Sequence, residues 1–431
     1  MIRKLIYQSV LWRGLYFISV LGLNIVIARY FEASYSGLIY FITNSFALVV
    51  TIGSLSLESG VGYYVASGKM EPMKLANFSV IWSCFAGLAT YVTIKILLGQ
   101  DLIPVSYNAY SFLAICYICG CMLLNFFLAL FYAVKNFFLP NVVMICINTL
   151  LIFLPLFGNG KIMTPKLYVN IYFLGFLLQG VILSVFFYMK NSREKTTGLR
   201  GKISLSKIFR YSFLAFLANM LFFLVYRIDY WFVQKYCTPE ALGNYIQVSK
   251  IVQMLLILPA ILSSAIFPVI AGRDMEQEGE KLAMLIRSSL LLYLFICLVF
   301  AASGYWLFPF IFGESFSDMY LPFILLIPGI LSLVMLYPVI AYFAGRKKMW
   351  VNIKALLLPL CIIITGDLIF IPMYGIAAAA LISSIGYIVY HLYLIKCFRK
   401  EFSVSKNLFY KIKFADYKKM KQLIIENFLR S

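Results

Sequence analysis

The chain has 431 residues, of which 63% are hydrophobic and only 13% charged, and its mean hydropathy is +0.90. Soluble domains are about half apolar and about a quarter charged, so this composition excludes a water-soluble protein and predicts an integral membrane protein. The formal net charge of +20 is typical of a membrane protein whose cytoplasmic loops are rich in lysine and arginine. Nine cysteines, mostly inside apolar runs, and a single histidine give no metal-ligand or redox pattern, so we expect neither kind of site.

Twelve apolar runs of helical length follow one another along the chain. A membrane-spanning helix needs about 20 apolar residues and a barrel strand about 10, so the runs predict an all-α protein with about twelve spans. The basic N-terminus is followed by no small-residue cleavage site, and the first run is therefore expected to stay as a span. The runs lie near 10–31, 37–66, 75–98, 108–133, 138–157, 168–190, 207–235, 242–270, 284–310, 320–344, 351–371 and 375–397.

The distribution of lysine and arginine predicts the orientation of the spans. If both termini are cytoplasmic, 30 of the 37 basic residues fall on the cytoplasmic side, five fall on the opposite side, and Arg227 and Lys250 lie within spans. Basic residues concentrate on the cytoplasmic side of multi-pass proteins, so cytoplasmic termini are expected.

The two halves of the chain resemble each other. At an offset of 206 residues the segment 28–41 aligns with 234–248, and Gly37 falls on Gly243. Six spans return the chain to the side on which it began, so the halves are predicted to be parallel repeats related by a pseudo-two-fold axis along the membrane normal. Further matches follow in the same order, pairing LFYAVKNFFLPN (130–141) with YFAGRKKMWVN (342–352) and LPLFG (154–158) with IPMYG (371–375).

These patterns predict four parts. We expect a six-helix bundle over 1–190, a cytoplasmic linker over 191–206, a second six-helix bundle over 207–397 and a basic cytoplasmic tail over 398–431. Apolar residues alternate with lysines in the tail, which fits an interfacial helix on anionic lipid and, equally, a disordered basic segment.

Several motifs resemble those of a known family. They are ARYFEASYSG after the first run, the Arg-Ile-Asp of residues 227–229, LGNYIQVSKIVQ after it, and then IFPVIA, AGRKK and LIFIPMYGIAAAALISSI. Together they look like the polysaccharide-transport members of the multidrug/oligosaccharidyl-lipid/polysaccharide exporter superfamily, which include O-antigen and capsule repeat-unit flippases. Each motif is loose, but their order is specific, and the resemblance covers nearly the whole chain.

The resemblance implies a fold and a function. The implied fold is two six-helix bundles forming a V around a central cavity, with alternating access. The implied function is to move a polyprenyl-pyrophosphate-linked oligosaccharide from the cytoplasmic to the outer leaflet of the bacterial inner membrane. Expected partners are membrane lipid, the lipid-linked glycan, a polysaccharide polymerase and chain-length proteins, without nucleic acid.

Two other functions remain open at this point. One is a cation-coupled multidrug exporter of the same superfamily, in which acidic residues would be expected to bind cationic substrates. The other is a membrane-embedded polysaccharide polymerase or transferase, which would need a large outer loop or a catalytic His/Asp pair. The outer loops here are short, and His391 is the only histidine, so we expect no catalytic residues and no enzyme activity.

Polar residues recur at equivalent depths of the two halves. Arg13 and Asn24 are eleven residues apart, three helical turns, so they share one face of the first span. The offset of 206 residues places them on Asn219 and Tyr230. If the halves face each other, these residues line the cavity, although Arg13 is also near enough to the membrane edge to extend into the headgroups. The predicted substrate-binding residues are Arg13, Asn24, Asn44, Asn219, Tyr226, Arg227, Tyr230 and Lys250.

Charged residues inside the spans suggest separate roles. Arg227 and Lys250 are candidate ligands for a pyrophosphate, because moving dense negative charge through an apolar region requires cationic groups. Arg227 and Asp229 are two residues apart and do not face each other on a helix, so an ion pair with another helix is an alternative for either. Coupling to Na⁺ or H⁺, with no other cofactor, would use buried carboxylates; the candidates are Glu58, Asp229 and Asp367, the last of which is expected to be exposed near the outer end of its span.

Overall fold

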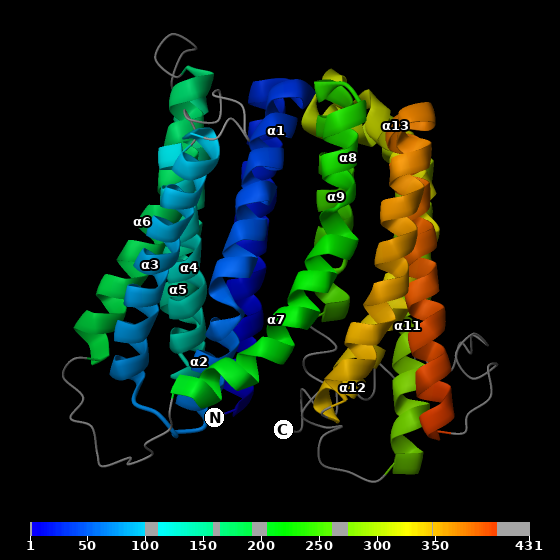
Figure 1. The fold of residues 1–431 in the computed structure, drawn as a ribbon. Coiled ribbons are helices and arrows are strands. Elements are labelled where there is room, and N and C mark those ends of the chain that lie inside the picture. The colour runs from blue at the N-terminus through cyan, green and yellow to red at the C-terminus, as the bar shows by residue number, and fades with distance from the viewer. Residues whose placement is uncertain are drawn as a thin grey trace. The chain divides into compact units, whose positions relative to one another are not determined.

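The computed structural model describes residues 2–99, 111–157, 164–191, 205–260, 275–346 and 348–402 (Figure 1). These residues are helical almost throughout, and no strand occurs among them. Most of the expected linker over 191–206, and the expected tail beyond Phe402, lie outside the described residues. The elements are α1 (Ile2–Ser54), α2 (Leu57–Ala66), α3 (Pro72–Gly99), α4 (Ser111–Ala133), α5 (Phe138–Phe157), α6 (Pro165–Asn191), α7 (Leu205–Arg227), α8 (Asp229–Tyr236), α9 (Pro239–Leu255), α11 (Met275–Phe312), the 3₁₀-helix η2 (Glu314–Met319), α12 (Tyr320–Gly345) and α13 (Met349–Phe402).

Ten helical stretches among the described residues are long and apolar enough to cross a membrane. Two of them, Leu11–Ser54 and Met349–Glu401, have 44 and 53 residues, at least twice the ~20 that one crossing needs. Each contains a break in helical geometry, at Glu32 (φ 57°, ψ −177°) in α1 and at Gly375 (φ 60°, ψ −143°) in α13. Ten stretches, two of them of double length, account for the twelve predicted spans.

Large apolar side chains point outward from these helices. Ile81 on α3 is 69% exposed and Phe310 on α11 is 75% exposed. Such extensive apolar exposure is unfavourable in water but suits hydrocarbon, and helices satisfy their backbone hydrogen bonds internally. The protein is therefore a multi-pass membrane protein of the all-α class.

The second predicted span differs from the structure near its C-terminal end. The run 37–66 was expected to be one helix, but α1 ends at Ser54, and Leu55 and Ser56 have left-handed φ values of 48° and 52°. The Ser54 hydroxyl accepts a hydrogen bond from the Ser56 amide at 3.2 Å. Serine side chains that bond nearby backbone groups compete with helical hydrogen bonds, which explains why the chain breaks here and restarts as α2.

Two compact units make up the chain. Unit 1 contains Met1–Phe31 and Ile42–Met220, and unit 2 contains Glu32–Phe41 and Leu221–Ser431. Unit 2 thus includes a short segment of the first half, at the break in α1. The bundle boundaries expected from the sequence stay a prediction.

Small residues bring helices into close contact inside each unit. In unit 1, a Cβ atom on Gly120 of α4 would lie 2.5 Å from the backbone nitrogen of Leu177 on α6. In unit 2, the Gly329 amide of α12 donates a hydrogen bond to the Ser384 hydroxyl of α13 at 2.8 Å. Close backbone approach at small residues is a common way for helices to associate in lipid, where no hydrophobic driving force acts between them.

The closest such approach joins the segment Glu32–Phe41 to α9. A Cβ atom on Gly37 would lie 2.6 Å from the Cα atom of Gly243, and one on Gly243 would lie 1.8 Å from the carbonyl oxygen of Ala33. The two glycines occupy equivalent positions in the internal repeat.

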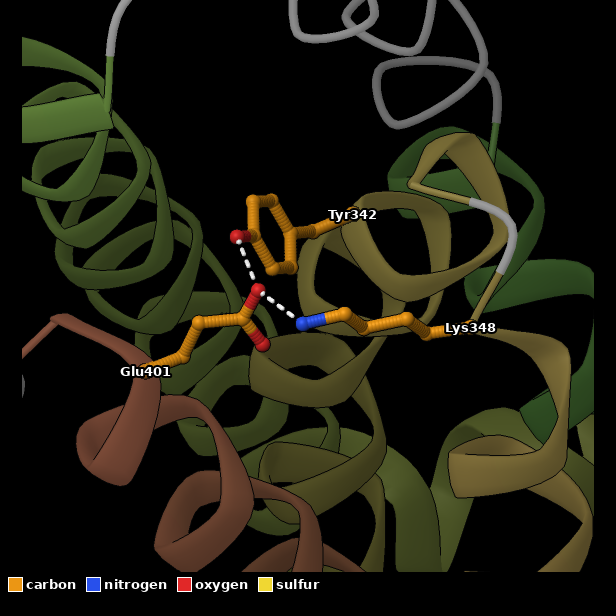
Figure 2. A network of polar contacts seen from close by, with 3 residues as sticks. All are labelled: Tyr342, Lys348 and Glu401. Atoms are coloured by element: carbon orange, nitrogen blue, oxygen red, sulfur yellow. Dashed lines mark hydrogen bonds and ion pairs between the residues drawn. The ribbon is translucent and has the colours of Figure 1, made fainter.

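A polar network closes the end of unit 2 at which α13 terminates (Figure 2). Glu401 accepts hydrogen bonds through Oε1 from the Tyr342 hydroxyl at 2.9 Å and from the Lys348 ammonium at 2.7 Å. The network joins the last turns of α12 and α13 to the short connection between them. It fixes the two ends of α13, more than 50 residues apart in sequence, against the same helix.

We predict that Gly243→Ala destabilises the protein by about 1–3 kcal/mol or more, because the added methyl group overlaps a backbone carbonyl that cannot move aside. Thermal unfolding of the purified protein in detergent measures the effect. Gly14→Ala is the matched control, since a Cβ atom there meets nothing within 4 Å. An unfolding temperature for Gly243→Ala equal to that of Gly14→Ala would contradict the close contact.

Candidate functional site

The candidate site lies in the seventh span of the protein, Ser206–Tyr236, which contains α7 and α8. The α-helix α7 ends at Arg227 and α8 begins at Asp229, with a turn at Ile228 between them. The helix α9 follows after Thr238, whose hydroxyl accepts a hydrogen bond from the Ala241 amide at 3.2 Å and caps the helix. Ile228 keeps helical dihedral angles (φ −64°, ψ −31°), so Arg227 and Asp229 lie within one apolar stretch, where ionisable residues usually have a function.

The carboxylate of Asp229 is buried among three helices of unit 2. Its Oδ2 atom accepts hydrogen bonds from the Tyr245 hydroxyl of α9 and, at 3.0 Å, from the Ser383 hydroxyl of α13. Its Oδ1 atom is buried and has no hydrogen-bond partner among the described residues. Neutral hydroxyl donors therefore satisfy one oxygen of this carboxylate and leave the other available.

Asp367 of α13 is a second buried carboxylate in the same unit. Both of its oxygens are buried without a hydrogen-bond partner among the described residues, and Asp229 is near enough to act on it electrostatically. The expected exposure of Asp367 is wrong, because Gly366 allows the two spans of α13 to pack closely: a Cβ atom there would lie 2.7 Å from the Ile382 side chain. The close packing shields Asp367 completely.

Together the two carboxylates have three buried oxygen atoms without a hydrogen-bond partner among the described residues. Buried polar atoms are nearly always satisfied in proteins, so such a group indicates a binding role. Carboxylate and hydroxyl oxygens are the ligands that hard cations prefer, and one carboxylate next to another can also hold a shared proton. The pair, defined here as the Asp229–Asp367 pair, is chemically suited to bind a cation.

Two basic residues, Arg227 of α7 and Lys250 of α9, lie in the same unit. The Arg227 guanidinium donates a hydrogen bond to Gln253 Oε1 at 3.2 Å, and its centre lies 5.0 Å from the Phe223 ring centroid. The Lys250 Nζ atom lies 2.7 Å from the centroid of the Tyr40 ring. Arg227 is close enough to act on Lys250 electrostatically. Two basic side chains within apolar helices are chemically suited to bind an anion.

Tyrosines surround these charges. Tyr230 is buried, and its hydroxyl accepts a hydrogen bond from Gln253 Nε2 at 3.4 Å. Tyr226 stacks on Tyr387 with ring centroids 5.1 Å apart. Of the residues predicted to bind substrate, the structure brings together in unit 2 Tyr226, Arg227, Tyr230 and Lys250.

The remaining predicted residues lie in unit 1. The Arg13 guanidinium lies 4.4 Å from the Tyr132 ring centroid, so it has a local aromatic partner. Asn24 and Asn44 are buried, and Asn219 donates a hydrogen bond to the Ser56 hydroxyl at 3.0 Å. That these four residues line one cavity together with the predicted residues of unit 2 stays a prediction.

Glu58 also lies in unit 1, in the first turn of α2. Its Oε2 atom is buried and has no hydrogen-bond partner among the described residues. The role of Glu58 in ion coupling stays a prediction.

Sequence reasoning missed Ser383 and Gln253, which bond Asp229, Arg227 and Tyr230. Ser383 lies 154 residues from Asp229, so no local pattern connects them. The available signal was chemical: a carboxylate in an apolar span requires hydroxyl or amide donors on a neighbouring helix.

A family model described as polysaccharide biosynthesis protein matches residues 26–321, more than half of the chain. The chain belongs to the polysaccharide biosynthesis protein family. No curated protein sequence matches it.

Solved transporter structures share the fold of this polysaccharide biosynthesis protein. The lipid II flippase MurJ, in an inward closed conformation, is similar with a TM-score of 0.67 and 16% identity over 98% of this chain and 100% of that one. A mutant of the Vibrio cholerae MATE transporter VcmN is similar with a TM-score of 0.65 and 16% identity, over 95% of this chain and 98% of that one. A MOP superfamily transporter from Pyrococcus furiosus has a TM-score of 0.58 and 15% identity, over 94% of this chain and 96% of that one. The resemblance recognised in the sequence and the all-α fold class are confirmed.

Proposed function

We propose that this protein is a flippase that moves a polyprenyl-pyrophosphate-linked oligosaccharide repeat unit from the cytoplasmic to the outer leaflet. The product would supply a surface polysaccharide such as O-antigen or capsule. Membership of a polysaccharide biosynthesis family and a fold shared with a lipid II flippase support this proposal. We place the protein in the bacterial inner membrane with both termini in the cytoplasm, as the distribution of basic residues favours.

The observation that carries the proposal is the pair of basic residues in unit 2. Arg227 and Lys250 are near enough to interact electrostatically, and they lie in helices that are otherwise apolar. A pyrophosphate is a dense anion, and charge-assisted hydrogen bonds from arginine and lysine are the strongest neutralising contacts that a protein supplies. The nearby Asp229 accepts its hydrogen bonds from Tyr245 and Ser383, and we propose that Arg227 and Lys250 bind the anionic head of the substrate.

The same observation favours the leading function over its alternative. A multidrug exporter of this fold would bind mainly cationic compounds and would need acidic groups facing them. Binding-pocket polarity does distinguish functions within the fold, since reverse polarity of the pocket suggests a different function for the Pyrococcus furiosus transporter. Basic residues beside buried tyrosines favour a substrate with an anionic head and sugar rings.

The Asp229–Asp367 pair supplies a place for a coupling ion. We propose that Na⁺ or H⁺ binds at the three unpartnered carboxylate oxygens, and that its binding changes the packing of α8 and α9 against α13. Buried carboxylates serve such roles in many transporters. A polysaccharide polymerase and chain-length proteins would receive the flipped product, and no catalytic step is part of the proposal.

Deletion of the gene in its native host tests the function. We expect surface polysaccharide to be lost and a complete polyprenyl-linked repeat unit to accumulate on the cytoplasmic leaflet, because synthesis continues while translocation stops. Mass spectrometry of extracted lipid-linked sugars measures the accumulation. Unchanged glycans together with raised sensitivity to cationic drugs would instead identify a multidrug exporter.

Substitution of Lys250 tests the anion site. We expect Lys250→Ala to lower polysaccharide export by about 10- to 100-fold at normal protein level, because a hydrogen bond to a charged group contributes about 1.5–3 kcal/mol. Lys250→Arg should retain part of the export, since it keeps the charge. Lys235→Ala is the matched control, because Lys235 is exposed at the end of α8. Equal export by Lys250→Ala and the wild type would remove Lys250 from the site.

A further inference from the structure

A cavity of about 840 Å³ opens at one end of unit 2, and its lining includes neither the Asp229–Asp367 pair nor Arg227 and Lys250. It lies where α8 meets α9, where η2 leads into α12, and where the two spans of α13 join at Gly375. This end of unit 2 is opposite the end at which α13 terminates (Figure 1). With cytoplasmic termini it is the outer end. The volume is in the range of ordinary small-molecule sites.

Four tyrosines from four helices converge on this cavity. They are Tyr236 of α8, Tyr305 of α11, Tyr320 of α12 and Tyr374 of α13. Tyr305 is 61% exposed and Tyr374 is 63% exposed, so much of each ring is accessible. We call this feature the tyrosine pocket. A belt of interfacial tyrosines would be spread around the outside of a bundle, whereas these four line one cavity.

The rings are held in position. The Tyr320 hydroxyl donates a hydrogen bond to the Ala301 carbonyl at 2.8 Å. Tyr305 meets Tyr320 edge to face, with ring centroids 5.8 Å apart and an interplanar angle of 86°. An anchored ring thus supports an exposed one, which reduces the conformational entropy that binding has to overcome.

The polar side of the tyrosine pocket rests on η2. The Ser315 hydroxyl accepts a hydrogen bond from the Ala33 amide at 3.1 Å. The backbone carbonyl of Ser315 accepts a second one from Asn244 Nδ2 at 2.9 Å. Phe316 and Met319 of the same short helix are fully buried. The adjacent Ser317 and Asp318 therefore extend into the pocket from a fixed backbone, and no described residue forms an ion pair with Asp318.

The backbone of α13 completes the wall. Gly375 has φ 60° and ψ −143°, a conformation that is almost restricted to glycine. The reversal there turns the chain between the two spans and presents Tyr374 beside the pocket. A Cβ atom on Gly375 would be 3.9 Å from the Cys237 sulfur on the facing wall, so the two sides of the pocket approach each other here.

The chemistry of the lining selects the kind of ligand. Among the described residues, no lysine or arginine lines the pocket, and the charged residue of the lining is Asp318. A carboxylate repels phosphate, so the pocket does not suit the pyrophosphate part of a lipid-linked sugar. Tyrosine ring faces pack against the apolar faces of sugar rings, while hydroxyl and carboxylate groups accept hydrogen bonds from sugar hydroxyls. The combination fits a neutral oligosaccharide.

We infer that the tyrosine pocket binds the oligosaccharide part of the lipid-linked substrate at the outer face, as a site separate from the one that holds the pyrophosphate. This inference rests on the proposed function. Binding at the outer end holds the glycan after translocation, before the lipid-linked unit leaves the protein. The pocket also contacts sugar groups that Arg227 of α7 and Lys250 of α9 do not contact.

Glycan binding by the full-length protein in nanodiscs tests this inference. The probe is the set of oligosaccharides released by partial hydrolysis of the native organism's surface polysaccharide, which carry neither lipid nor pyrophosphate. Saturation-transfer NMR should detect binding to the wild type and a loss of about tenfold or more in the double variant Tyr305→Ala/Tyr374→Ala, as expected when two aromatic anchors are removed. Phe295→Ala is the matched control, because Phe295 is an exposed aromatic on α11 outside the pocket, and it should bind as the wild type does.

Two results would overturn the inference: absence of binding to the wild type, or equal binding by the wild type and the double variant. Failure of the proposed function is a separate outcome. It would appear as unchanged lipid-linked sugars in the deletion strain, whatever the purified protein binds. The milder variant Tyr305→Phe/Tyr374→Phe keeps both ring faces and should keep most of the binding, so a fold defect in the alanine variant can be recognised.

Discussion

The hydrogen bonds from Tyr245 and Ser383 to the buried Asp229 carboxylate join three helices of unit 2, and the rest of the candidate site is arranged around them. A carboxylate in an apolar bundle is costly unless donors surround it. Here the donors are neutral hydroxyls on α9 and α13. The basic groups of Arg227 and Lys250 belong to the same unit, and we propose that they bind the anionic head of the substrate. One carboxylate thus links the packing of α8, α9 and α13 to the charge of the proposed substrate site.

Close contacts at glycines also determine how the apolar helices pack against one another in lipid. The Gly37–Gly243 contact attaches a segment of the first half to α9, and Gly366 brings the two spans of α13 together over Asp367. Each close approach replaces hydrophobic association with direct backbone packing. The same packing buries Asp367 next to Asp229, so the helix contacts and the proposed ion site depend on each other.

Much of the fold could be predicted from the sequence because membrane-spanning helices are set by length and hydropathy. The twelve runs correspond to the helical stretches, and the offset of 206 residues found the glycine pair that meets in space. The break at Leu55–Ser56 was missed because it depends on local serine hydrogen bonds. Ser383 and Gln253 were missed because their partners are distant in sequence, and the exposure of Asp367 was misjudged because the packing at Gly366 has no signal in hydropathy.

Translocation of a defined polyprenyl-pyrophosphate-linked oligosaccharide in proteoliposomes tests the central claim most directly. The substrate is placed in both leaflets, and the fraction of sugar accessible to an added lectin or periodate is followed in time. We expect the reconstituted protein to move the protected fraction outward much faster than protein-free liposomes do, and the Lys250→Ala variant to be slow. Equal rates with and without protein would contradict the account.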